Sequence, residues 1–119
     1  MNWNIRNDAP VYTQLVDQIA RAIILGQFPP GSKLPSVRDF ASDAGVNPNT
    51  MQRALAELET RGLLETQRTA GRTVTSDTEK ITQTRQALAQ TLVHNFYHQA
   101  LALGLTKAEI TALLEQEEA

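Results

Sequence analysis

The run from residue 34 to residue 64 constrains the fold most, because it predicts two short helices joined by a tight turn at residues 43–46. Asn47 follows the turn, and its side-chain oxygen can accept a hydrogen bond from an unpaired N–H at the start of the second helix. Pro48 suits the first helical position, where no N–H is needed. The apolar residues that follow recur at the spacing of one buried helical face, namely Met51, Ala54, Leu55 and Leu58.

The opposite face of this second helix is polar near its start. It carries amide, hydroxyl and guanidinium groups, on Asn49, Thr50, Gln52 and Arg53. Such groups hydrogen-bond to base edges in the major groove of DNA. The pattern therefore predicts a helix-turn-helix whose second helix enters the major groove. A plain helical hairpin with a solvated outer face is the alternative at this point.

Two short β-like runs follow, at residues 63–67 and 73–75, and the residues between them predict a hairpin tip at 68–72. The tip carries Arg68 and Arg72. Two arginines on a small hairpin beside a recognition helix predict a wing that touches the DNA backbone or the minor groove.

With these elements in place, the chain resembles the winged-helix domain of GntR-type transcription regulators. Residues 30–38 match the family's Pro-Gly-x-x-Leu-Pro-Ser-x-Arg run, and residues 10–15 match its opening. The Val-Asn-Pro-Asn-Thr turn at residues 46–50 resembles the YtrA-like subgroup in particular, in which a short helical tail replaces a large ligand-binding domain. The resemblance covers residues 8–75, and the tail by its size and character.

The resemblance implies a mainly α-helical chain with a small β-hairpin wing: a winged helix-turn-helix domain at residues 1–75 and a two-helix dimerisation and effector tail at 76–119. It implies a sequence-specific transcriptional regulator, a dimeric repressor that binds an inverted-repeat operator of a transporter operon and of its own promoter. Its partners would be double-stranded DNA, a second copy and a small-molecule effector. The expected DNA contacts are Lys33, Ser36, Arg38, Asn47, Asn49, Thr50, Gln52, Arg53, Arg68, Thr69, Gly71 and Arg72.

Arg38 is the strongest single candidate among these contacts. It lies in the first turn of the first short helix, where a cation opposes the helix dipole at a cost of about a few tenths of a kcal/mol. A phosphate or a guanine acceptor nearby would offset that cost. The alternatives are a solvated arginine or a pair with Asp39 or Asp43.

The wing departs from the family pattern. Thr69 and Val74 stand where many relatives have a glycine and an aromatic residue, so the resemblance does not predict the geometry of the tip or its groove contacts.

Helix ends are also predicted from local chemistry. Residues 1–9 are expected to form an arm, and Asp8 to cap the first helix, which Gly26 ends. Ser36 is expected to cap the next helix, with Asp39 as its partner in a capping box. Gly62 is expected to end the recognition helix.

The tail predicts one long and one short helix. A capping box at residues 76–79 opens a helix over about 77–103, and another at 106–109 opens the last one. Because two helices have little to bury against in so small a protein, we predict that they pair with a second copy in a two-fold dimer. The expected interface residues are Leu88, Leu92, Phe96, Leu103, Ile110, Leu113 and Leu114.

His94 and His98 lie four residues apart on the long helix, a spacing that can hold a metal ion. A third ligand is not evident, so two partly exposed polar residues on a dimer helix are the simpler interpretation, and no metal or other cofactor is expected. A metal or pH response through the tail is the alternative.

Composition narrows the remaining classes. The 119 residues include no cysteine and no apolar run of membrane-spanning length, so a cytoplasmic protein without a membrane partner is expected. There is no glycine-rich phosphate loop and no His–carboxylate cluster, which argues against an enzyme. The net charge is −2, and the acid is concentrated in the tail, since residues 1–75 hold eight Lys and Arg against seven Asp and Glu. The alternative function is a winged-helix protein-interaction module with the acidic tail as a docking helix.

Overall fold

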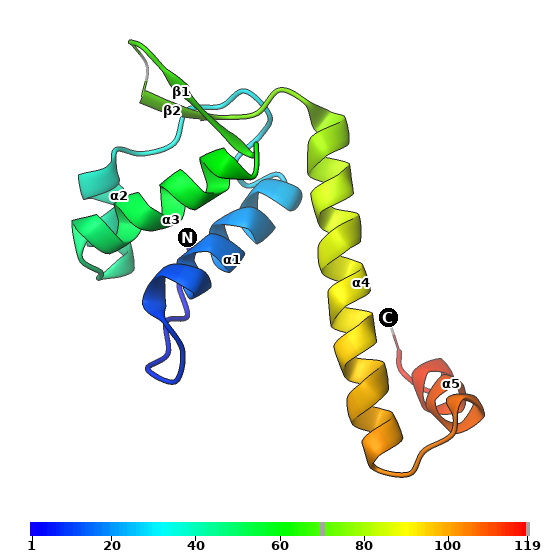
Figure 1. The fold of residues 1–119 in the computed structure, drawn as a ribbon. Helices are drawn as coiled ribbons and strands as arrows, with labels where there is room; N and C mark the ends of the chain where they lie inside the picture. Colours follow the sequence, from blue (N-terminus) through cyan, green and yellow to red (C-terminus); the bar gives the residue numbers. More distant parts are fainter. Residues whose placement is uncertain (70, 119) are drawn as a thin grey trace. The chain divides into compact units, whose positions relative to one another are not determined.

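The computed structural model describes residues 1–69 and 71–118, which are mainly helical with one antiparallel hairpin, as predicted (Figure 1). The elements follow in the order α1 (Val11–Ile24), α2 (Val37–Ala44), α3 (Pro48–Thr60), β1 (Leu64–Gln67), β2 (Gly71–Val74), α4 (Thr78–Ala102) and α5 (Lys107–Glu115). The chain forms two compact units, Met1–Thr84 and Arg85–Ala119. No described helix is long and apolar enough to cross a membrane.

The core of the first unit forms where α1, α2 and the hairpin pack on α3. The periodic face predicted for α3 is confirmed, because its four apolar residues are at most 1% exposed. Side chains from every element of the unit fill the remaining space, and the largest of those fully buried are Leu15, Ile19, Ile23, Phe40, Leu63 and Val74. α1 packs along α3 and so forms part of the scaffold behind it.

The turn between α2 and α3 is built as the sequence predicts, but it is shorter. α2 continues to Ala44, and Gly45 then adopts a left-handed conformation with φ of 70°. Asn47 Oδ1 accepts a hydrogen bond from the Asn49 N–H at 2.8 Å, and Pro48 is the first residue of α3. This turn sets the angle at which α3 leaves α2, and so the direction of its polar face.

Two helix starts differ from the prediction. Asp8 does not cap α1: the cap position is Pro10, which makes no side-chain cap bond, and Asp8 pairs instead with Arg6 at 3.3 Å. Ser36 does cap α2, because its Oγ accepts from the Asp39 N–H at 3.2 Å. A capping box also needs the reverse bond, from the Ser36 N–H to the Asp39 side chain. Only the first of the two bonds is found among the described contacts.

The N-terminal arm is held against α1 by two glutamine side chains. The Gln14 amide accepts from the Arg6 N–H at 2.7 Å and donates to the Arg6 carbonyl at 2.8 Å. Gln18 makes the same pair of bonds with Asn4, at 3.0 and 2.8 Å. Because the two glutamines are one helical turn apart, they bind alternate residues of the extended arm.

The arm also reaches α2. The Trp3 ring packs edge-on against Phe40 with centroids 5.1 Å apart, and its indole N–H donates to Asp43 Oδ2 at 2.7 Å. The arm therefore contacts both helices that pack on α3.

The hairpin is shorter at its tip than predicted. β2 begins at Gly71, so Gly71 and Arg72 belong to a strand and not to the tip, where Arg68 and Thr69 lie. Ala70, also predicted in the tip, lies outside the described residues. The left-handed φ of 73° at Gly71 lets the chain enter β2 directly from a tight turn.

The helix that leaves the hairpin starts differently from the prediction. Asp77 Oδ1 accepts from the Lys80 N–H at 3.2 Å, so Asp77 caps α4 in place of the predicted pair at residues 76 and 79. Ile81 packs against the core of the first unit, and the compact units accordingly divide after Thr84 where the sequence suggested a division after residue 75. The division of functions between the two parts stays a prediction.

The second unit has a small core of its own. Ala100 of α4 and Ile110 of α5 are its buried apolar residues among those described. Gly104 ends α4 with φ of 88°, as predicted. The capping box predicted for α5 is confirmed, with Thr106 and Glu109 bonded reciprocally at 3.0 and 3.2 Å.

Candidate nucleic-acid interface

The first half of α3 presents a polar, exposed face. Asn49, Gln52 and Arg53 are exposed and lie on the side away from the core, whereas Thr50 is half-buried. Asn47 precedes them and is exposed, with its side-chain oxygen committed to the helix cap. The start of α3 therefore presents hydrogen-bond donors and acceptors from neighbouring helical positions.

Arg53 is held by α1. Its guanidinium carbon lies over the Tyr12 ring, 3.6 Å from the ring centroid. Such a cation–π contact restrains the position of the guanidinium and leaves its N–H groups able to donate.

Arg38 is exposed in the first turn of α2 and makes no ion pair with any residue that the structure describes. The alternative pairs with Asp39 and Asp43 are absent from the described ion pairs. Asp43 Oδ2 instead accepts a hydrogen bond from the Trp3 indole N–H. The cation therefore has no partner within the described chain to offset the helix dipole.

Lys33 comes from the loop before α2, and main-chain bonds tie this loop to the wing. Lys33 forms an isolated β-bridge with Thr73, and the neighbouring Leu34 N–H donates to the Arg72 carbonyl at 2.9 Å. Because the loop runs along β2, the exposed Lys33 side chain lies beside the hairpin.

The two wing arginines have different environments. Arg68 is exposed at the tip, next to exposed Thr69. Arg72 is only 16% exposed, because its guanidinium pairs with Glu59 of α3 and donates from Nη1 to Gln52 Oε1 at 3.2 Å. Of the two, only Arg68 projects as the wing prediction requires.

The carboxylate of Glu59 is stabilised in its charged form. Partial burial acts to raise its pKa, but hydrogen bonds from Arg72 and Thr66 and the charge of Arg72 outweigh burial. The pKa of Glu59 therefore lies below its ordinary value of 4.5, and Glu59 is a stable anion at neutral pH.

Sequence reasoning missed two residues of this surface. Glu59 pairs with Arg72, and Tyr12 of α1 lies under the guanidinium of Arg53. Both contacts join elements far apart in the chain, so no local spacing predicts them.

The tail residues predicted at a dimer interface are mostly exposed. Ile110 is buried and Leu88 half-buried, whereas Leu92, Phe96, Leu103, Leu113 and Leu114 are between 48% and 82% exposed. Several of them line a groove of about 570 Å³ between α4 and α5.

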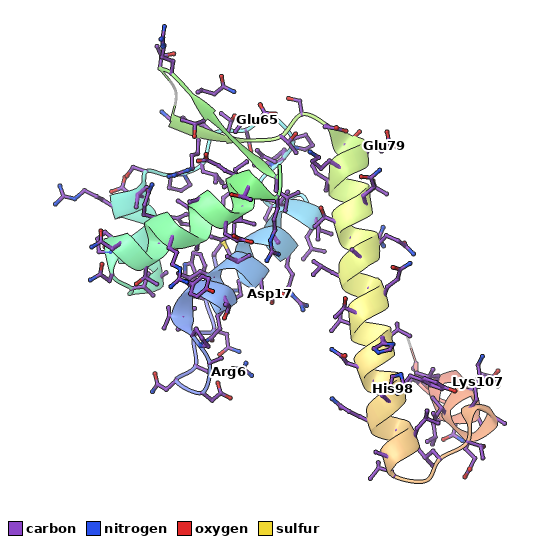
Figure 2. All side chains as sticks on the ribbon, in the orientation of Figure 1. Arg6, Asp17, Glu65, Glu79, His98 and Lys107 are labelled. Atoms are coloured by element: carbon purple, nitrogen blue, oxygen red, sulfur yellow. The ribbon has the colours of Figure 1, made fainter. Side chains whose placement is uncertain are left out.

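The two histidines lie side by side on α4, with ring centroids 4.3 Å apart. Lys107, at the start of α5, shares a shallow pocket with His94 and Tyr97, and Figure 2 marks it together with His98. In the described part of the chain no group of three His, Cys, Asp or Glu residues is placed to hold a metal ion.

Comparison with known proteins identifies a family. The family model "Bacterial regulatory proteins, gntR family" matches residues 11–74, from the start of α1 to the end of β2. The HTH-type transcriptional regulator YhcF of Bacillus subtilis is 36% identical over 110 residues, which cover 92% of this chain and 91% of YhcF.

Two further relatives are similar along most of their length. The HTH-type transcriptional repressor YtrA of Bacillus subtilis is 34% identical over 98 residues, covering 77% of this chain and 75% of YtrA. A solved GntR family transcriptional regulator from Listeria monocytogenes matches with a TM-score of 0.91 at 37% identity, covering 96% of this chain and 100% of that one. These proteins are named as transcriptional regulators and not as enzymes.

Proposed function

Since this chain belongs to the GntR family of bacterial regulatory proteins and resembles its YtrA-like members, we propose that it is a dimeric repressor of an inverted-repeat operator. Family membership makes it a transcriptional regulator with a DNA-binding helix-turn-helix. Repression is supported by the name of its relative YtrA. The proposed targets are the promoter of its own gene and a transporter operon, and the proposed place of action is the cytoplasm.

The observation that carries the proposal is the exposed polar start of α3. Asn49, Gln52 and Arg53 project from a helix whose other face is buried in the core. A helix docked by its N-terminal half in the major groove would bring these three groups to base edges. Each good base contact would contribute roughly 1–3 kcal/mol of discrimination.

Cations on neighbouring elements would hold the DNA backbone. Arg38, Lys33 and Arg68 are exposed and make no ion pair in the described chain. They come from α2, the loop before it and the wing. One domain would therefore contact phosphates on both sides of the groove. Thr69, Ser36 and Asn47 would add uncharged contacts.

The dimer is supported by the apolar face of the second unit. Phe96, Leu103, Leu113 and Leu114 expose large apolar surfaces around one groove, which a monomer in water would leave unfavourably hydrated. A second copy of the same two helices would cover them in a two-fold interface. The groove also has the size of a small-molecule pocket, so an effector could act at this interface.

The experiment is fluorescence anisotropy on DNA from upstream of the protein's own gene, at two salt concentrations. Tight binding that falls steeply with salt is expected, since each phosphate contact contributes a slope of about −0.9 in log K against log salt. An unrelated duplex of equal length is the control. No binding at low salt, with or without candidate effectors, would contradict the proposal and favour a protein partner for the same surface.

A further inference from the structure

Both strands of the hairpin contribute a side chain to the Glu59 carboxylate of α3. Thr66 and Arg72 face each other directly across the hairpin, so their side chains lie on the same face of it. The preceding pair on that face, Leu64 and Val74, is buried in the core, which turns the face towards α3. Thr66 Oγ donates to Glu59 Oε1 at 2.8 Å, and Arg72 Nε donates to the same oxygen.

The same arginine reaches the recognition helix. Gln52 and Glu59 are seven residues apart on α3 and therefore lie on one side of it, two turns from each other. Arg72 spans this distance: its Nε is on Glu59 and its Nη1 lies 3.2 Å from Gln52 Oε1. The ion pair thus ends in a hydrogen bond to an exposed residue of the polar face.

This bond determines which end of the Gln52 amide is presented outward. A guanidinium can only donate, so the amide atom facing Arg72 must be the oxygen. The Nε2 group then points away from Arg72 and makes no hydrogen bond to any described residue. Gln52 therefore offers N–H donors to its surroundings while its acceptor is already engaged.

We propose that Arg72, held by Glu59, is a positioning residue that sets the base preference of Gln52. This inference rests on the proposed function, in which the polar face of α3 reads base edges. An unconstrained glutamine pairs with adenine through one donor and one acceptor. With its oxygen bonded to Arg72, Gln52 instead suits a base edge that offers acceptors, and guanine presents two of them, N7 and O6, in the major groove.

A direct phosphate contact by Arg72 predicts different behaviour. Loss of a phosphate contact weakens binding to all sequences about equally and reduces the salt slope by about one. Loss of a positioning contact changes the preference at one base pair and leaves the salt slope as it was. The low exposure of Arg72 and its pairing with a carboxylate favour the second behaviour.

The test is selection of binding sites from a randomised double-stranded DNA library with the full chain, followed by affinity measurements on single-base variants of the selected site. The informative substitution is Arg72→Lys, because lysine keeps a positive charge for Glu59 but lacks the second arm that reaches Gln52. Wild type should prefer guanine at one base pair of each half-site. In Arg72→Lys that preference should fall by roughly tenfold or turn to adenine, with an unchanged salt slope.

Gln52→Ala should lose the preference at the same base pair. Combining Arg72→Lys with Gln52→Ala should cause no further loss of that preference. Arg61→Lys is the matched control, because Arg61 pairs with Glu57 on the same helix, at 3.0 Å, without touching Gln52. Its base profile should equal that of wild type. Circular dichroism checks that each variant is folded.

A second readout needs no DNA. Side-chain amide relaxation measured by NMR should show an ordered Gln52 amide in the free wild-type protein and a mobile one in Arg72→Lys. An Arg72→Lys variant with the wild-type base profile, or with an equally ordered Gln52 amide, overturns the inference while leaving the proposed function standing. Failure of the wild type to select any sequence would overturn both.

Discussion

The guanidinium of Arg53 lies over the ring of Tyr12, 3.6 Å from its centroid, so a residue of the first helix holds a residue of the recognition helix in place. A cation–π contact at an exposed site contributes about 0.5–1 kcal/mol. If the contact prepares Arg53 for binding, Tyr12→Leu should weaken operator binding by about two- to fivefold. Tyr12→Phe keeps the aromatic face and should bind nearly as wild type. Anisotropy titrations of both variants check this, and equal weakening in both would assign the effect to the tyrosine hydroxyl.

Arg38→Ala should weaken operator binding without unfolding the protein. The side chain is exposed and makes no ion pair in the described chain, so its removal leaves nothing buried unpaired. If it contacts a phosphate, the salt slope should fall by about one. Arg21→Ala removes an exposed arginine from α1 as the control. A lower melting temperature in Arg38→Ala alone would assign it a structural role.

Leu55→Ala should reduce the free energy of unfolding by roughly 2–5 kcal/mol, because Leu55 is only 1% exposed and its truncation leaves a cavity in the core. Leu25→Ala is the matched control: Leu25 is 73% exposed, and the same substitution there should change stability by less than about 0.5 kcal/mol. Urea unfolding followed by circular dichroism compares the two. Similar losses would mean that Leu25 is covered in solution.

Leu113→Glu should convert the proposed dimer into a monomer, because it places a charge in the apolar groove between α4 and α5. Thr111→Glu adds the same charge to α5 at an exposed position outside that groove and should leave the dimer intact. Sedimentation velocity at micromolar concentration measures the state of each. A wild-type monomer would refute the dimer outright.

A fragment that ends after Thr84 also tests the proposed dimer, because it lacks the second compact unit. It retains Ile81, which packs on the core, and should therefore fold as a monomer. Its operator affinity should be poor, since it would bind one half-site without a linked partner. Thermal melting and anisotropy give the two measurements, and full affinity in the fragment would contradict a role for the tail in DNA binding.

Glu59 makes stability depend on pH in the acid range. Its pKa is lower in the folded protein than its ordinary value of 4.5, so the stabilisation is fully present above that value. It is lost as the pH falls through the lowered folded pKa. The melting temperature of wild type should exceed that of Glu59→Gln at pH 7, and the difference should shrink as the pH falls below 4.5. A constant difference would show that the charge of Glu59 is not the cause.

Local sequence chemistry predicted the architecture well. Gly45 and Asn47 define the turn before α3, and the Thr106–Glu109 box opens α5, because each feature depends on residues only a few positions apart. The failures at Asp8 and at residues 76–79 differ. At α4 the neighbouring Asp77 provides the cap, whereas the cap position of α1 is Pro10, without a side-chain cap bond, and Asp8 pairs with Arg6. Both outcomes depend on the tertiary structure and not on local spacing.

The residues of the candidate site were predicted, but the contacts between their side chains were not. Helical periodicity placed Gln52 and Arg53 on the exposed face of α3, and both residues are exposed. That Arg72 would turn inward to Glu59 follows from the strand register and from where the core places the hairpin. Neither is encoded at short range, so a basic residue near a hairpin tip was assigned to the tip.

The docking of the arm has a practical consequence for spectroscopy. Trp3 is the sole tryptophan of the chain, and its indole packs on Phe40 and bonds to Asp43. Intrinsic fluorescence excited in the tryptophan band therefore reports from within the first compact unit alone, without any attached dye. Far-ultraviolet dichroism sums all helices, including the long α4. When the two signals are recorded during one thermal melt, comparing them distinguishes unfolding of the first compact unit from unfolding of the second.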